Sequence, residues 1–282
     1  MVGSTTQGAN SQAEVNQDVR HGYAPVNGLE MYYEIQGAGQ PLVLLHGAFS
    51  AIGTSFGGLL PALAQTRQVI AVELQGHGRT ADIDRPLTME GLVDDIAALL
   101  RHLGVDTADV FGCSLGGGIA LALTIRYPEM VRKLIFAGGA CYSPEGFYPE
   151  LLAGIQSMTP DALVGSPFYE EYMRLNPKPD NFPALVEKVK RLDADIPSIS
   201  PETMRAITAP TLLINGDSDI VRPEHLVEMF RLLGGGVLRF DGTVAASQLA
   251  VVPGTDHVML MYRTDILIPI VQAFLDAPMP QP

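Results

Sequence analysis

The sequence predicts an α/β fold built on a mostly parallel sheet. From about Tyr23 onward, short apolar segments typical of buried strands alternate with helical patterns. Strands that are apolar throughout and separated by helices indicate parallel pairing with right-handed crossovers. The chain has 282 residues, of which 47% are hydrophobic and 17% are charged. This composition is sufficient for one main core that needs neither disulfides nor metals.

Strand and helix patterns alternate along most of the chain. The clearest helix is Met89–Leu103, whose apolar residues recur every three or four positions and whose N-terminus Thr88 can cap. A second helix, from Leu115 to about Tyr127, ends before Pro128 and is apolar nearly all round, which predicts burial against the sheet. The predicted strands are Met31–Ile35, Leu42–Leu45, Val69–Val72, Ala108–Phe111, Leu134–Ala137, Leu212–Ile214 and Gln248–Val252.

The N-terminal segment carries no strand or helix pattern. Its first twenty residues are rich in Gln, Asn and Ser, with neither the basic start nor the apolar stretch of a secretory signal. We therefore expect a disordered tail over residues 1–22 and a cytoplasmic protein. The longest apolar runs fall well short of the ~20 residues that span a bilayer.

The alternation stops between residues 143 and 207, where helical patterns follow one another. The sequence predicts an inserted all-helical cap at 143–207, with the main core formed by 23–142 and 208–278. Aromatic residues are concentrated in and just before this insert, since Tyr142–Phe182 holds seven of the nineteen Phe and Tyr residues. They can form the core of the insert or line an apolar ligand pocket.

The charge balance excludes several classes of partner. The formal net charge of −13 has the wrong sign for binding phosphate backbones or anionic lipid. The two cysteines, Cys113 and Cys141, form no spacing that binds zinc. No dinucleotide fingerprint, P-loop or metal motif is present. We therefore expect a small-molecule substrate, with no nucleic acid, membrane, metal or cofactor as partner.

The most informative motif is Gly112-Cys113-Ser114-Leu115-Gly116, which follows a predicted strand and opens a predicted helix. This is G-x-S-x-G in the strand–turn–helix context of a nucleophile elbow. A nucleophile on such a sharp turn needs small residues two positions away on each side, which the two glycines provide. Cys113 is a rival nucleophile, but centring the turn on it would place bulky residues at those positions. We interpret Cys113 as a small apolar residue packed beside the elbow.

Ser114 needs a general base, which on such a sheet should follow a late strand. Of the six histidines, His225 and His257 lie late enough. His225 sits in an apparent helix start, where we expect a solvated side chain. His257 follows the last predicted strand through a loop at the correct edge and is the predicted base. His46 is predicted to brace its own loop.

An orienting acid and an oxyanion hole complete the predicted site. The strand Leu212–Ile214 ends near Asp217 and Asp219, and either can serve as the acid while the other satisfies turn amides. For the oxyanion hole, Leu115 offers a backbone N–H at the start of its helix, and Ala48 is the best-placed second donor.

With these motifs, the chain resembles the α/β-hydrolase superfamily over nearly all of residues 23–277. The resemblance implies an eight-stranded, mostly parallel sheet with helices on both faces and a helical cap after the sixth strand. It also assigns the acid to Asp219 and one oxyanion N–H to Ala48. One departure is Glu73, where many relatives carry Asp, and we attach no catalytic meaning to it.

The resemblance narrows the reaction without fixing it. Haloalkane dehalogenases and epoxide hydrolases of this superfamily carry Asp at the elbow, so Ser114 argues against both. Proline iminopeptidases carry a Gly-Gly-Pro-Gly-like sequence where this chain has Gly47-Ala48-Phe49-Ser50, so we do not expect peptidase activity. We expect a carboxylesterase; lactonase, perhydrolase and carbon–carbon bond hydrolase remain open, as does a ligand-binding protein with little turnover. The expected substrate-binding residues are Phe49, Tyr142, Phe147, Phe168, Tyr169 and Tyr172.

Overall fold

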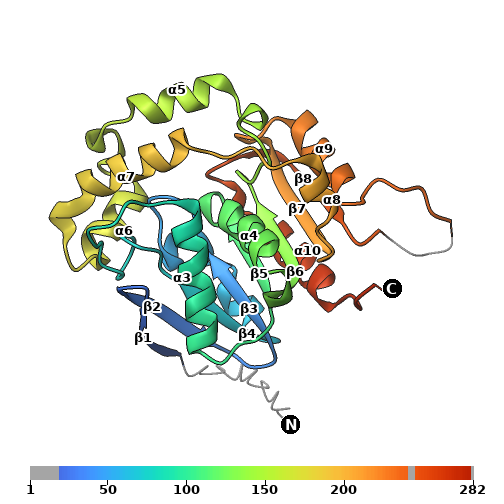
Figure 1. The fold of residues 1–282 in the computed structure, drawn as a ribbon, viewed down its shortest axis with the longest axis horizontal. Helices are drawn as coiled ribbons and strands as arrows, with labels where there is room; N and C mark the ends of the chain where they lie inside the picture. The colour runs from blue at the N-terminus through green and yellow to red at the C-terminus, as the bar shows by residue number, and fades with distance from the viewer. Residues whose placement is uncertain (1–18, 241–244, 281–282) are drawn as a thin grey trace, which may run out of the picture.

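The computed structural model describes residues 19–240 and 245–280, and these residues form one eight-stranded sheet (Figure 1). Strands β1 and β2 pair antiparallel, as do β2 and β4, and every other neighbouring pair is parallel. The spatial order is β1-β2-β4-β3-β5-β6-β7-β8. The predicted fold class is confirmed. The strands are β1 (Arg20–Val26), β2 (Leu29–Gln36), β3 (Gln40–Leu45), β4 (Arg67–Val72), β5 (Ala108–Cys113), β6 (Val131–Ala137), β7 (Thr211–Ser218) and β8 (Gln248–Asp256).

The first strand was not predicted from its own residues, and it corrects the expected tail. Because β1 begins at Arg20, the prediction of disorder is wrong for residues 20–22, while residues 1–18 lie outside the described part of the chain. Only Ala24 and Val26 of β1 are buried, so the apolar signal is too short to recognise. Pairing with β2 through a turn at Asn27 and Gly28, both with positive φ, stabilises this strand.

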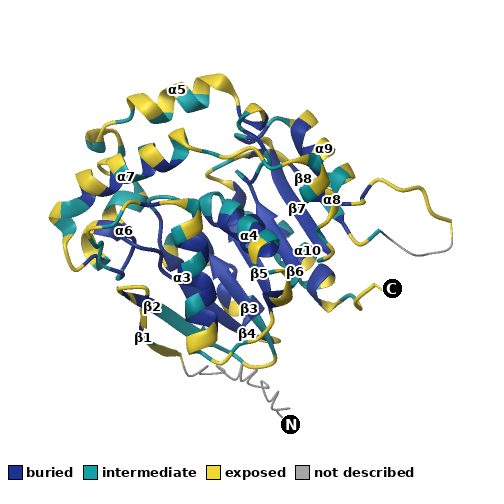
Figure 2. Cartoon of the chain, viewed as in Figure 1, coloured by how far each residue is buried: buried dark blue, intermediate teal, exposed yellow. Residues whose placement is uncertain are grey.

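Helices cover both faces of the sheet, as the resemblance implied. In β3, Val43 and Leu45 belong to one core cluster and Leu42 and Leu44 to another, because alternate residues of a strand point to opposite faces. Helices α3 and α4 pack on the first cluster, and α1, α2 and α10 on the second (Figures 1 and 2). The helices are α1 (Ile52–Phe56), α2 (Leu60–Leu63), α3 (Met89–His102), α4 (Leu115–Arg126), α5 (Pro149–Ser157), α6 (Pro167–Leu175), α7 (Phe182–Ala194), α8 (Pro201–Arg205), α9 (Pro223–Leu232) and α10 (Thr264–Asp276).

The two helices predicted in detail are confirmed. The Thr88 hydroxyl accepts a hydrogen bond from the Gly91 amide at 3.1 Å and so caps α3. Helix α4 is buried on several sides, with Ile119, Ala120 and Leu123 inaccessible to solvent. It packs closely on β5 and β6, which fixes the position of its N-terminus next to the end of β5.

Helices α5 to α8 lie between β6 and β7 in the chain. Figure 1 shows α5, α6 and α7 as a layer beyond one end of the sheet. The inner side of α7 is buried, whereas α5 has no buried residue (Figure 2). The carboxyl ends of the parallel strands reach the edge of the sheet where ligands bind on open α/β folds.

Candidate active site

Ser114 lies on a strained turn between β5 and α4. Its φ of 52° and ψ of −119° fall outside the regions that non-glycine residues normally occupy. A Cβ on Gly112 would collide with the carbonyl oxygen of Gly116, and a Cβ on Gly116 would collide with that of Leu45. The steric explanation of the G-x-S-x-G spacing is therefore confirmed.

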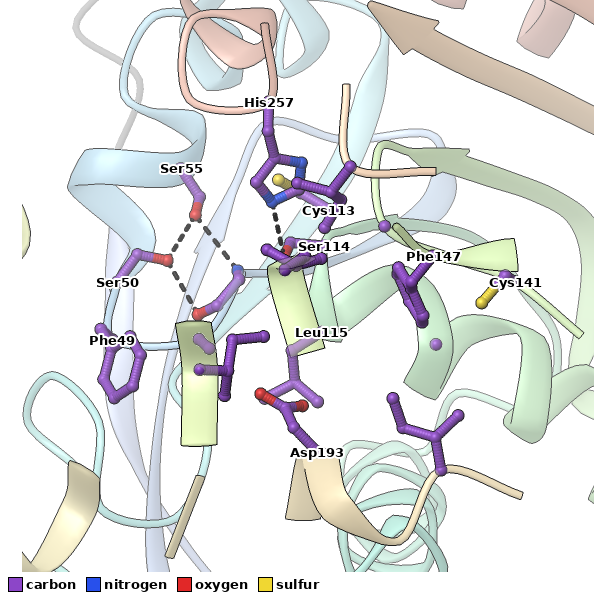
Figure 3. Close-up of a pocket in the computed structure, with 18 of the residues that line it drawn as sticks. Phe49, Ser50, Ser55, Cys113, Ser114, Leu115, Cys141, Phe147, Asp193 and His257 are labelled. Carbon is purple, nitrogen blue, oxygen red and sulfur yellow. Dashed lines mark hydrogen bonds between the residues drawn. The ribbon is translucent and has the colours of Figure 1, made fainter. Parts of the chain in front are cut away.

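Three predicted side chains from three distant segments meet at this turn. The Nε2 atom of His257 lies 3.0 Å from the Oγ of Ser114 (Figure 3). The Nδ1 atom of the same ring lies 2.7 Å from Oδ1 of Asp219. The Asp219 carboxylate is completely buried, and it accepts hydrogen bonds from the amides of Gly216 and Ile220 at 3.2 and 2.7 Å. These amides hold the carboxylate in the orientation that contacts His257.

Asp217 has a different set of partners. Its carboxylate accepts hydrogen bonds from the backbone amides of Gly254 and Thr255 at 2.8 and 3.2 Å. The Gly254 amide, followed by that of Thr255, lowers the pKa of Asp217 because both bonds favour the charged form. Of the two aspartates at the end of β7, Asp219 contacts His257, and Asp217 ties β7 to the end of β8.

Sequence reasoning missed the glycine pair after β6. Gly138 and Gly139 have φ values of 63° and 72°, a left-handed conformation that favours glycine. A Cβ on Gly138 would lie 3.0 Å from Nδ1 of His257, and one on Gly139 would lie 2.9 Å from Cα of Ser114. The signal was available in the sequence, since two consecutive glycines directly follow a predicted strand of the same sheet.

The loop after β3 is held by His46, as predicted. The His46 side chain is fully buried; its Nε2 accepts from the Leu74 amide at 3.0 Å, so Nδ1 donates to the Gly47 carbonyl at 2.7 Å. Burial lowers the pKa of His46 to about 3, which keeps the ring neutral and able to accept. The Ser50 hydroxyl also donates to the Gly47 carbonyl, at 2.9 Å (Figure 3).

The two predicted oxyanion donors lie at the same cavity as Ser114. Ala48 and Leu115 both line it. Leu115 is the first residue of α4, and the first amides of a helix have no acceptor within the helix. Phe49, the next residue of the loop, has a φ of 62°, so the chain turns sharply after Ala48. Leu115 follows Ser114 in the chain, and the loop that holds Ala48 lies against Ser114, since a Cβ on the neighbouring Gly47 would be 3.1 Å from the Ser114 Cβ.

Cys113 is confirmed as a buried residue beside the elbow. It is 8% exposed and packs in the apolar cluster on the α10 side of the sheet. Burial, with the nearby Asp219 charge, raises the pKa of its thiol to about 12. The thiolate, which is the reactive form of cysteine, is therefore scarce at neutral pH.

A cavity of about 360 Å³ opens above Ser114 and His257. Three of the expected substrate-binding residues, Phe49, Phe147 and Phe168, line it. Apart from Ala48 and Leu115, the aliphatic and thioether side chains that make up much of its remaining lining were not predicted, although Leu151 and Ile155 lie one turn apart on the same side of α5. Among the described residues, none of those that line the cavity is a lysine or an arginine. The other aliphatic or thioether side chains contributed by the α5–α8 segment are Leu152, Met158, Leu163, Ile196 and Ile199.

The three tyrosines expected to bind substrate, Tyr142, Tyr169 and Tyr172, are not among the described residues that line the cavity. Tyr169 and Tyr172 both pack edge-on against Phe182, with ring centroids 5.1 and 4.9 Å apart, and form the core of the helical segment. Tyr142 stacks on His225 at 4.4 Å. His225 is itself only 5% exposed, which corrects the expected solvated side chain. A small helical layer needs aromatic residues for its own packing.

Comparison with known proteins shows the family to which the chain belongs. Residues 40–192 match the model of the alpha/beta hydrolase fold, so the chain belongs to the α/β-hydrolase family. It is 27% identical to a 2-hydroxy-6-oxo-2,4-heptadienoate hydrolase of Pseudomonas putida over 290 aligned positions, which cover 95% of this chain and 99% of that protein. It is 40% identical to a 2-hydroxymuconate semialdehyde hydrolase of a Pseudomonas species, over 37% of this chain and 38% of that protein.

Solved structures share the fold. A serine hydrolase involved in carbazole degradation superposes with a TM-score of 0.72 at 21% identity, covering 91% of this chain and 98% of that one. A carboxylesterase structure from Nitrososphaera gargenis gives a TM-score of 0.70 at 24% identity, covering 91% and 97%. These structures show the shared fold, whereas the family and the two hydrolase relatives indicate that the protein is a hydrolase. In the described part of the chain, no helix has the length and apolar character needed to cross a membrane.

Proposed function

We propose that the protein cleaves carboxylic esters of small to medium apolar substrates through an acyl-enzyme on Ser114. The observation that carries this proposal is the chain of contacts from Ser114 through His257 to Asp219, at 3.0 and 2.7 Å, beneath a mainly apolar cavity. A volume of about 360 Å³ lies near the lower end of the roughly 300–1,000 Å³ range of ligand pockets. Such a cavity suits a short acyl or alcohol group.

In the acylation step, the Ser114 oxygen attacks the ester carbonyl carbon while Nε2 of His257 takes the hydroxyl proton. The carbonyl oxygen becomes negatively charged and receives hydrogen bonds from the amides of Ala48 and Leu115. The bond to the leaving alcohol then breaks, and His257 returns its proton to that oxygen. Asp219 accepts from the Nδ1–H of His257 and stabilises the imidazolium that forms in between.

In the deacylation step, water replaces the alcohol. His257 takes a proton from the water, whose oxygen attacks the acyl carbon, and the same two amides stabilise the second oxyanion. The intermediate breaks to release the carboxylic acid, and Ser114 recovers its proton from His257. The strained backbone of Ser114 keeps its Oγ exposed to substrate and water at the floor of the cavity throughout.

The segment 143–207 is proposed to act as the cap that selects the substrate. It supplies aliphatic side chains of the cavity from α5 and from the chain after α7, together with Phe168 of α6. The sheet-borne core supplies Ser114, Asp219 and His257. In this proposal the segment 143–207 selects the substrate, and the sheet-borne core cleaves the bond.

A carbon–carbon bond hydrolase is the second candidate, because two relatives are named for such substrates. A heptadienoate carries a carboxylate. In the described part of the chain, the cavity lining contains no lysine or arginine to bind that charge, and it contains the carboxyl group of Asp193. This lining favours an ester without a negative charge over a dienoate. Lactones and peracid formation use the same serine chemistry and fall within the proposed mechanism.

The decisive experiment measures steady-state hydrolysis of p-nitrophenyl esters with two to twelve acyl carbons, beside a 2-hydroxy-6-oxo-dienoate, with Ser114→Ala as the control. We expect turnover of the shorter esters, little cleavage of the dienoate, and no activity in the variant. No fluorophosphonate labelling and no turnover of any ester or of the dienoate would instead indicate a ligand-binding protein on this fold. A kcat/KM higher for the dienoate than for every ester would establish the second candidate.

A further inference from the structure

Asp193 occupies an unusual position on α7. It follows Val186 by seven residues and Val189 by four, and these two valines are 0% and 1% exposed. Residues at these spacings share one face of a helix, so Asp193 belongs to the face that α7 turns toward the protein. It lines the cavity, and in Figure 3 its carboxyl group points into it, in the direction of Leu115.

In the described part of the chain, the carboxyl group of Asp193 has no partner. Within residues 19–240 and 245–280, no hydrogen bond or ion pair joins it to another side chain or to the backbone. Burial alone raises its pKa to about 6, since no nearby cation offsets the loss of water. Three other acidic side chains, all fully buried, are each paired with an arginine: Glu73 with Arg79 at 2.8 Å, Asp95 with Arg85 at 2.5 Å and Asp109 with Arg132 at 2.5 Å.

We propose that Asp193 binds a positively charged nitrogen of the substrate, so that the preferred ester carries a protonated amine at the far end of an apolar chain. That the substrate is an ester rests on the proposed function. That Asp193 binds a cation does not depend on it. Asp193 comes from the helical layer and Ser114 from the sheet, so the amine and the ester group would contact different walls of the cavity.

Two physical arguments favour a cation. A carboxylate in a mainly apolar cavity is costly when unpaired, and an ammonium group brought in by the ligand supplies the missing partner. The net charge of −13 also raises the local concentration of cations and lowers that of anions. An anionic substrate would meet Asp193 without any lysine or arginine of the described cavity lining to balance it.

The binding site is tested first without any reaction. Calorimetric titration compares hexylammonium with 1-hexanol at pH 8, where Asp193 is ionised and the amine is protonated. The proteins are the wild type, Asp193→Asn and Asp195→Asn; Asp195 is exposed, lies just beyond α7 and does not line the cavity. We expect the wild type and Asp195→Asn to bind hexylammonium at least about tenfold more tightly than hexanol, and Asp193→Asn to lose this preference.

Turnover is tested next with matched p-nitrophenyl esters of four, six and eight acyl carbons that end in methyl, hydroxyl, ammonium or carboxylate. For at least one of these chain lengths, the wild type should cleave the ammonium ester with a kcat/KM about tenfold above that of the methyl ester. Asp193→Asn should still cleave the methyl ester but should no longer prefer the ammonium ester.

Equal binding of hexylammonium and hexanol by the wild type would overturn the inference. So would an ammonium preference that persists in Asp193→Asn, or a hydroxyl ester as good as the ammonium ester at every length. Asp193-dependent binding of hexylammonium without cleavage of any ester would leave the site standing and remove the proposed reaction instead. Asn has nearly the same shape as Asp and removes a buried charge, so the variant is expected to fold.

Discussion

The Oγ of Ser114 and the Nε2 of His257 lie 3.0 Å apart, although 143 residues separate them in the chain. The elbow between β5 and α4 fixes the first atom, and the loop after β8 fixes the second. Because the parallel strands end at the same edge of the sheet, the two loops face each other. This distance allows direct transfer of the hydroxyl proton.

Replacing Ser114 by Ala should abolish ester hydrolysis. Loss of the nucleophile costs about 10⁶-fold in kcat in the best-studied serine protease, and we expect a comparable loss here. Cys113→Ala, at the neighbouring buried position, should keep most of the activity because its thiol is not ionised near pH 7. Steady-state kinetics and fluorophosphonate labelling of both variants measure the difference. Survival of activity in Ser114→Ala together with its loss in Cys113→Ala would assign the nucleophile to the thiol.

The two aspartates at the end of β7 should give opposite phenotypes. Asp219→Asn keeps the shape but no longer stabilises the His257 imidazolium, so we expect kcat to fall by about 10⁴-fold with a small change in Tm. Asp217→Asn weakens the acceptors of the Gly254 and Thr255 amides, so it should lower Tm and largely preserve kcat. Thermal melts and kinetics on both proteins check this. The assignment fails if Asp217→Asn is inactive and Asp219→Asn is only less stable.

Acid should destabilise the fold through two buried histidines. Burial lowers the pKa of His46 to about 3 and that of His77 to about 4, from 6.5 when unfolded. The unfolded chain therefore binds more protons below pH 6.5, so this part of the stability is complete above pH 6.5 and declines as the pH falls toward 4. At pH 5 the loss is about 2 kcal/mol for each ring.

Urea denaturation at pH 7 and pH 5 measures this loss. His77→Asn keeps a donor for the Gln75 carbonyl that contacts Nδ1 of His77 but cannot titrate, so the difference in unfolding free energy between the two pH values should shrink by about 2 kcal/mol. His102→Asn, at an exposed position on α3, is the control and should leave that difference unchanged. An unchanged difference in His77→Asn would contradict the assignment to buried, neutral rings.

Substrate selection should depend on Phe168 and not on Tyr172. Phe168 lines the cavity, whereas Tyr172 is 3% exposed, packs on Phe182 and has its hydroxyl 3.4 Å from the Lys178 carbonyl. Phe168→Ala enlarges the cavity, so the acyl-chain optimum of kcat/KM should shift toward longer chains. Tyr172→Phe should keep the wild-type optimum and change only Tm. A shift of the optimum in Tyr172→Phe, with none in Phe168→Ala, would show that the cavity is lined differently.

Some expectations held because they depend on residues close together in the chain. The spacing of Gly112 and Gly116 around Ser114 is a local steric requirement, and the structure shows the collisions that a side chain would cause. Alternation of apolar segments with helices likewise gave the parallel sheet. In contrast, β1 has only two buried residues and becomes a strand by pairing with β2, so its own residues carry too little signal.

What the sequence by itself determined is the fold class, the elbow and the place of a histidine after the last strand, since local sterics and hydrophobic periodicity decide these features. The tertiary structure decided which aromatic rings face the cavity and that Gly138 and Gly139 lie against the site. It also placed Asp193 at the cavity without a partner in the described chain. These features depend on contacts between segments distant in the sequence, because folding brings those side chains together and a local pattern does not record their relative orientation.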